Sequence, residues 1–202
     1  CRDVAGVSES SVEMNSGLQF YDGITSTEIQ SILIKSAADL ICLETPNYQY
    51  VAARLLLFQV RKSVFNTKWK DSEIYPPLKD IVLRNINYNV YDEKLITYYS
   101  DEEWEKLDSY MKHDRDLLFT YAGLRQVVDK YLVQDRSSGQ LYESPQYMYM
   151  LIAATLFKEY PSENRLQYVK RYYDSVSSFK INIPTPIMAG IRTPLRQFAS
   201  CV

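Results

Sequence analysis

Cysteine, histidine and glycine are scarce in this sequence, which has three, one and six of them among 202 residues. Three cysteines cannot form the disulfide framework of a small secreted domain, so we expect a reducing, cytoplasmic setting. One histidine and scattered cysteines argue against a metal site of the zinc type, because zinc ligands are closely spaced. The chain also has no Gly-x-Gly-x-x-Gly or phosphate-loop pattern, so neither common nucleotide-binding motif is present.

Long apolar runs and a strong net charge are missing as well. No run of about 18 apolar residues and no signal peptide is visible, so we expect no membrane partner. A formal net charge of -2 gives no electrostatic reason to expect a nucleic-acid partner. What is abundant is tyrosine, with eighteen residues, and tyrosine suits half-buried helix faces and interfaces.

The first half of the chain has the apolar periodicity of helices. We expect Thr27 to cap a helix from Glu28 to about Cys42, in which the apolar register buries the Cys42 thiol. A break at residues 45–47 precedes a second expected helix over about 48–64. Two helices joined by such a short turn make an αα-hairpin.

The middle of the chain begins with a strong local signal. Residues 100–103 read Ser-Asp-Glu-Glu, a capping box that predicts the start of a helix. This helix is expected to break near residues 113–116, and an apolar helical pattern continues over about 117–128. Residues 131–142 then contain two short β-prone runs around a glycine-containing turn, which predict a small β-hairpin.

The last third combines a very apolar helix with a proline-rich loop. Pro145 suits the first position of a helix, and residues 147–157 are apolar on every face, so we expect that helix to be buried on all sides. An amphipathic helix is expected from Pro161 through Val176. After several prolines, residues 197–202 have the pattern of the start of a strand.

Few side chains stand out as candidates for chemistry. His113 lacks the nucleophile that a catalytic histidine would activate, and we favour a structural cluster of ion pairs and hydrogen bonds at a helix junction. Thr185 and Ser200 carry hydroxyls that could bind an anion or a ribose, although a threonine between prolines is more often part of a turn. Cys201 is either a buried small residue or a redox thiol, and composition alone favours burial.

Long segments of this chain resemble the large subunit of class I ribonucleotide reductase. The resemblance covers essentially the whole chain and is strongest from Tyr131 onwards. Its segments are residues 19–23, 47–54, 113–116, 130–135, 166–180, 183–190 and 192–202, the last ending in Phe-Ala-Ser-Cys-Val.

The family reduces ribonucleoside diphosphates to deoxyribonucleotides in a ten-stranded α/β barrel. A metal-containing small subunit generates a radical, which is relayed to a cysteine that abstracts the ribose 3′ hydrogen. Two further cysteines supply the electrons, and thioredoxin or glutaredoxin re-reduces their disulfide. By resemblance, Cys201 is the first of these two redox-active cysteines, while Thr185 and Ser200 hold the phosphate and ribose ends of the substrate.

The resemblance also implies three parts. Residues 1–64 are similar to the back part of an ATP-cone, truncated at its front, which senses ATP against dATP. Residues 65–178 correspond to the helical amino-terminal domain of the reductase, and residues 179–202 to the substrate loop and first barrel strand. Ser26 and Lys62 match nucleotide-binding positions of the cone, with Ser in place of the Thr of the best-known relatives. Without the front of the cone, we expect this chain alone not to bind ATP.

We therefore expect a mainly α fold with a small β-hairpin and one barrel strand at its end. The radical cysteine and the second reducing cysteine follow Val202 in the family, so the chain alone is expected to be inactive. An incomplete sequence, a split gene and an intein product, which would explain Cys1, all stay open. A hypothesis of another class is a stand-alone helical regulatory module derived from the cone, but such a module needs neither the Cys201 motif nor the Thr185 loop.

Overall fold

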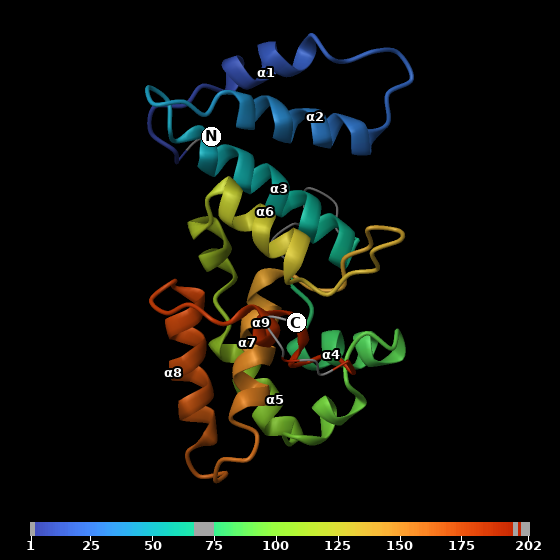
Figure 1. The fold of residues 1–202 in the computed structure, drawn as a ribbon, viewed down its shortest axis with the longest axis vertical. Helices are drawn as coiled ribbons and strands as arrows, with labels where there is room; N and C mark the ends of the chain where they lie inside the picture. Colours follow the sequence, from blue (N-terminus) through green and yellow to red (C-terminus); the bar gives the residue numbers. More distant parts are fainter. Residues whose placement is uncertain (1–2, 67–74, 196–197, 199–202) are drawn as a thin grey trace.

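The computed structural model describes residues 3–66, 75–195 and 198. The regular secondary structure of this part of the chain is entirely helical. Figure 1 shows the amino-terminal helices, drawn in blue and teal, stacked at one end and a larger helical body at the other. The helices are α1 (Glu9–Gly17), α2 (Ser26–Asp39), α3 (Tyr48–Phe65), α4 (Leu78–Asn87), η2 (Glu93–Thr97), α5 (Asp101–Tyr110), η3 (His113–Leu118), α6 (Tyr121–Lys130), α7 (Pro145–Leu156), α8 (Arg165–Ser177) and α9 (Thr185–Gly190).

Helix α2 begins two residues earlier than its sequence pattern predicts. Thr25, and not Thr27, is the cap: its hydroxyl accepts from the Glu28 amide, and the Glu28 carboxylate accepts from the Thr25 amide. This pair is a capping box, in which each side chain satisfies a backbone donor of the other residue. The prediction of Thr27 was wrong because Glu28 stands at the third helical position only when Thr25 is the cap.

The early end of α2 also overturns the predicted burial of Cys42. The helix stops at Asp39, so Cys42 lies in the following turn and is exposed. Thr45 closes this turn by donating its hydroxyl to the Leu40 carbonyl at 2.8 Å. Because the helical register ends before residue 42, its thiol is no longer held on the apolar face.

Helix α3 confirms the predicted second helix and joins the two layers of the molecule. It runs antiparallel to α2, and Gln30 donates from α2 to the Leu55 carbonyl at 2.8 Å. On its other side α3 packs against α6. Asn66 ends it in the left-handed region with φ 52°, which asparagine tolerates better than most residues. The αα-hairpin of α2 and α3 is therefore as predicted.

Helix α7 is the centre of the larger body, as its apolar pattern predicts. All eleven residues from Pro145 to Thr155 are buried, and α8, α9 and η3 pack around the helix. Burying an aliphatic or aromatic side chain contributes about 1.5–3 kcal/mol, so this helix is a principal source of stability. None of the described helices is long and apolar enough to cross a membrane.

The helices around α7 follow their capping signals more closely than their apolar patterns. The Ser100–Glu103 capping box begins α5 as predicted. Helix α6 does not continue from Leu117, however, because residues 113–118 form the 3-10 helix η3 and Thr120 caps a new helix. Helix α8 begins at Arg165, after a turn that follows Pro161, and so starts later than predicted.

The predicted β-hairpin at residues 131–142 is reduced to a turn. Its two arms share a single antiparallel bridge, between Gln134 and Leu141, and no β-strand occurs in residues 3–66 and 75–195. The Val133 amide donates to the Glu143 carboxylate instead of extending the ladder. The fold class is thus corrected to all-α for the described residues. The barrel strand predicted over residues 197–202 lies, apart from Phe198, outside them.

Candidate functional site

Thr185 lies at the rim of a cavity of about 560 Å³ between α6, α7 and the loop before α9. It is the first residue of α9, and the extended Pro184 (φ -57°, ψ 139°) precedes it. Its side chain is exposed, and its hydroxyl oxygen is 3.3 Å from the hydroxyl of Tyr131. Hydrogen bonds with Thr185 and then with Gln126 lower the pKa of the Tyr131 phenol. Thr185 is therefore placed where a ligand in the cavity could reach it.

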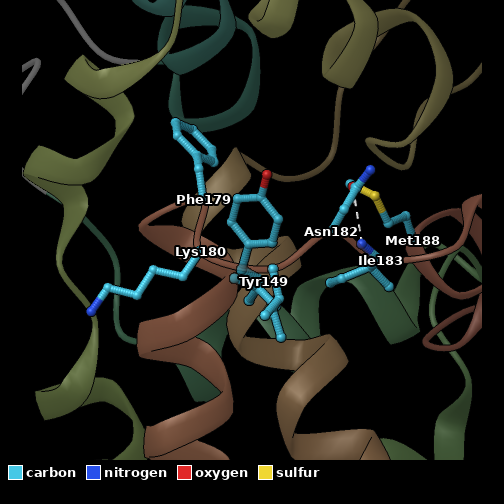
Figure 2. Close-up of a pocket in the computed structure, with 8 residues that line it drawn as sticks. Tyr149, Phe179, Lys180, Asn182, Ile183 and Met188 are labelled. Atoms are coloured by element: carbon cyan, nitrogen blue, oxygen red, sulfur yellow. Dashed lines mark hydrogen bonds between the residues drawn. The ribbon is translucent and has the colours of Figure 1, made fainter.

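A second hollow of about 320 Å³ adjoins this cavity and shares four lining residues with it: Tyr149, Asn182, Ile183 and Met188. Figure 2 shows the ring of Tyr149 rising from α7 into this hollow, while the Lys180 side chain extends away from it. Burial raises the pKa of the Tyr149 phenol, which keeps it neutral. Both hollows are thus walled mainly by neutral groups near Thr185.

A buried ion pair holds the Thr185 loop against the helical body. Arg192 and Glu143 are both fully buried, and the Arg192 Nε donates to the two carboxylate oxygens at 3.0 and 2.8 Å. The other guanidinium nitrogens donate to the Met188 carbonyl at 2.6 Å and to the Tyr131 carbonyl at 2.8 Å. The Tyr91 hydroxyl donates to Glu143 as well. One cation therefore connects the end of α9, the end of α6 and the segment before α7.

His113 belongs to an aromatic stack. Its ring stacks on Tyr75 with centroids 3.6 Å apart, and the Arg61 guanidinium lies 5.1 Å from the Tyr75 ring centroid. Burial, and then the charge of Arg61, lower the pKa of His113 to about 4. His113 itself makes ring contacts, while the ion pairs predicted for this segment are made by its neighbours: Arg115 pairs with Asp174 at 2.8 Å, and Asp116 lies 3.9 Å from Arg61.

Asp116 is a buried carboxyl in the same region. Gln146 of α7 donates to it at 2.8 Å, and the Arg61 guanidinium lies 3.9 Å away. Burial raises the pKa of Asp116 to about 7, against which the Gln146 hydrogen bond and the Arg61 charge act more weakly. A raised folded-state pKa means that the folded chain binds a proton which the unfolded chain has released.

This carboxyl predicts a pH dependence of stability. The folded state favours the protonated form of Asp116. The contribution of this residue to folding stability is therefore fully present below pH 3.8 and is lost as the pH rises to about 7. In Asp116→Asn that loss is absent, so the variant should gain on the order of 2 kcal/mol over the parent between about pH 4 and 8. Urea unfolding of both chains at several pH values measures this difference.

His113 supplies the opposite control. Because its pKa is lowered, the folded state disfavours the charged imidazole. The contribution of His113 to folding stability is therefore fully present above pH 6.5 and is lost as the pH falls to about 4. His113→Phe should therefore gain stability over the parent as the pH falls. The gain in stability should grow with rising pH for Asp116→Asn and with falling pH for His113→Phe, and gains that change with pH in the same direction would contradict both assignments.

The predicted nucleotide-binding residues of the cone lie on neighbouring helices. Ser26 is the first residue of α2, Lys62 is in the last turn of α3, and both are exposed. Because the two helices run antiparallel, these residues lie toward the same end of the pair (Figure 1). Ser200 and Cys201 lie outside the described residues, so their predicted roles stay predictions.

Sequence reasoning missed the side chains that hold the site together. Arg192, Glu143, Tyr131 and Gln126 were not among the candidates, although Arg192 and Glu143 are fully buried. A signal was present in Glu143, because a carboxylate directly before an entirely apolar helix needs a cation if it is buried. Among the described residues, no group of three or more histidine, cysteine or acidic residues could hold a metal ion.

Comparisons with known proteins agree in one family. Residues 117–196 match the family model described as the ribonucleotide reductase all-alpha domain. The chain is 51% identical over 197 residues to ribonucleoside-diphosphate reductase 1 subunit alpha of Escherichia coli, and this covers 97% of the chain and 25% of that protein. It is 49% identical over 197 residues to the alpha subunit of Haemophilus influenzae, with the same coverage.

The chain thus spans about a quarter of the length of the curated relatives it matches. The match is not confined to one motif, because it extends over nearly the whole chain. The more distant alpha subunit of Helicobacter pylori is still 34% identical over 203 residues. The chain therefore belongs to the class I ribonucleotide reductase large-subunit family and corresponds to the amino-terminal region of that subunit.

Proposed function

We propose that this chain forms part of a ribonucleotide reductase large subunit that converts ribonucleoside diphosphates to deoxyribonucleotides. The observation that carries this proposal is the 51% identity spread over 97% of the chain. Such identity over a whole segment is far more specific than any short motif in it. The chain would act only together with the remainder of the large subunit, with a radical-generating small subunit and with thioredoxin or glutaredoxin as partners.

In this proposal Cys201 is one of two reducing thiols. Loss of the ribose 2′ hydroxyl as water takes two electrons, and a pair of thiols delivers both as it becomes a disulfide. The partner thiol of Cys201 would come from the remainder of the subunit. The metal and radical chemistry would belong to the small subunit, and this chain would supply no ligand to that metal.

Two further pairs of side chains have proposed binding roles. Thr185 and Ser200 would hold the phosphate and ribose ends of the substrate, and the exposed Thr185 hydroxyl at the cavity rim supports this role. Ser26 and Lys62 would contact the triphosphate of ATP or dATP, or of another allosteric effector of the full subunit. A hydroxyl and a cation toward one end of α2 and α3 suit a triphosphate.

A chimeric subunit tests the proposed function. In it, this chain replaces the matching quarter of the Escherichia coli alpha subunit, and the product deoxyribonucleoside diphosphate is measured with that organism's small subunit and thioredoxin. We expect turnover within about tenfold of the parental subunit, since about 1.4 kcal/mol of imperfect fit costs one factor of ten. This chain alone should give no product. A chimera that folds and binds the small subunit but forms no product contradicts the proposal.

A further inference from the structure

Two side chains from the end of α6 and one from the start of α9 form a hydrogen-bonded row at the cavity. Gln126 Nε2 donates to the Tyr131 hydroxyl at 3.3 Å, and that hydroxyl is 3.3 Å from Thr185 Oγ1. All three residues line the cavity. Tyr131 and Thr185 are 54 residues apart in the chain, so only the fold brings them together.

The direction of the row decides what Thr185 offers to a ligand. The phenol oxygen accepts from the Gln126 amide, and either hydroxyl of the Tyr131–Thr185 pair can donate to the other. When the phenol is the donor, Thr185 Oγ1 accepts from Tyr131, and the proton of Thr185 is turned toward the cavity. Hydrogen bonds in such a row polarise one another, which strengthens the terminal donor. A ligand atom at Thr185 should therefore be a hydrogen-bond acceptor.

The buried Arg192 holds both ends of the Tyr131–Thr185 contact. Its guanidinium donates to the Tyr131 backbone carbonyl at 2.8 Å and to the Met188 carbonyl of α9, the helix that Thr185 begins, at 2.6 Å. Tyr131 as a whole residue is only 9% exposed. A fully buried group thus ties together the backbone on both sides of the Tyr131–Thr185 contact.

An oriented neutral donor matters here because the cavity offers no cation of its own. Among the described residues that line it, none carries a charge. An anionic or strongly polar ligand group at this rim must therefore be bound by neutral donors, and a donor already turned toward the ligand loses less freedom on binding.

We propose that Tyr131, supported by Gln126, is a positioning residue that presents the Thr185 hydroxyl as a donor to a phosphate or ribose oxygen of the substrate. This inference rests on the proposed function, in which Thr185 contacts the ribonucleotide. Tyr131 acts through Thr185 and does not touch the substrate itself. The effect belongs to substrate binding, so it changes KM more than kcat.

The test is a double-mutant cycle in the chimeric subunit. Tyr131→Phe removes one hydroxyl and keeps the ring, and it should raise KM for the ribonucleoside diphosphate by about two- to tenfold, as expected for one neutral hydrogen bond. The kcat should change less than KM. Thr185→Val should raise KM at least as much, and the double variant should match Thr185→Val alone, because Tyr131 has no other route to the substrate.

Two further variants complete the test. Gln126→Leu weakens the row from its exposed end and should raise KM in the same direction, which keeps the inference testable if Tyr131→Phe folds poorly. Tyr88→Phe removes the phenol hydroxyl of a residue that is 59% exposed and does not line this cavity, and it should leave KM and kcat unchanged.

The outcomes separate this inference from the proposed function. An increased KM in Thr185→Val with an unchanged KM in Tyr131→Phe overturns the positioning role and leaves the substrate role of Thr185 intact. Multiplying effects in the double variant also overturn it. An unchanged KM in Thr185→Val overturns the substrate role of Thr185 and, with it, this inference.

Discussion

Replacing Cys201 with serine in the chimeric subunit is expected to abolish turnover driven by thioredoxin or glutaredoxin. Serine keeps the size of the side chain and its hydrogen bonding, but a hydroxyl cannot form a disulfide with the second reducing cysteine. The two electrons needed to remove the ribose 2′ hydroxyl would then have no source. Steady-state formation of deoxyribonucleoside diphosphate measures the effect.

Cys42→Ser is the matched control for Cys201→Ser. Cys42 is an exposed thiol in the turn after α2, far in sequence from the Thr185 loop, and its replacement should leave turnover unchanged. A single turnover without added reductant should also oxidise Cys201, and alkylation of the remaining thiols would detect this. Normal turnover in Cys201→Ser would rule out its assignment as a reducing thiol.

Arg192→Leu is expected to destabilise the folded chain by about 3–5 kcal/mol, because it leaves the Glu143 carboxylate buried without its cation. Arg192 and Glu143 are both fully buried, and the guanidinium also satisfies the carbonyls of Tyr131 and Met188. One substitution thus removes a charge partner and several hydrogen bonds at once. Urea unfolding of the parent and the variant measures the loss.

Two companion variants identify the cause of that loss. Arg125→Leu removes an exposed arginine that pairs with Asp129 at 3.1 Å, and such a surface pair contributes only about 0.3–0.5 kcal/mol. The double variant Arg192→Leu with Glu143→Leu removes both buried charges and should recover much of the stability, since apolar pairs often replace buried ion pairs without loss. A double variant as unstable as Arg192→Leu would show that the stranded carboxylate is not the cause.

The buried ion pair also gives the Thr185 loop its place. Helix α9 has only six residues and contributes little stability of its own. Arg192 joins its Met188 carbonyl to Tyr131 and Glu143, which belong to the helical body. Partial loss of this contact is therefore expected to weaken substrate binding through Thr185 before it unfolds α7.

Features with short-range causes could be predicted from the sequence. The capping box of α5 needs only Ser100 and Glu103, three residues apart. The burial of α7 follows from a run of residues with no polar face. Where two caps compete, sequence reasoning failed: Thr25 and Thr27 are both plausible before α2, and only Thr25 forms the reciprocal bond with Glu28.

The sequence by itself determined the family and the order of helical segments in most of the chain, because these depend on long matching segments and on local patterns. It also supplied the candidate residues Thr185, Ser200, Cys201, Ser26 and Lys62. Tertiary structure alone decided that residues 131–142 form a turn without strands, that Cys42 is exposed, and that Tyr131 meets Thr185 across 54 residues. It also paired Arg192 with Glu143 across 49 residues. The physical reason is that such contacts satisfy buried charges and hydrogen bonds between segments, and no periodicity in the chain encodes which segments meet.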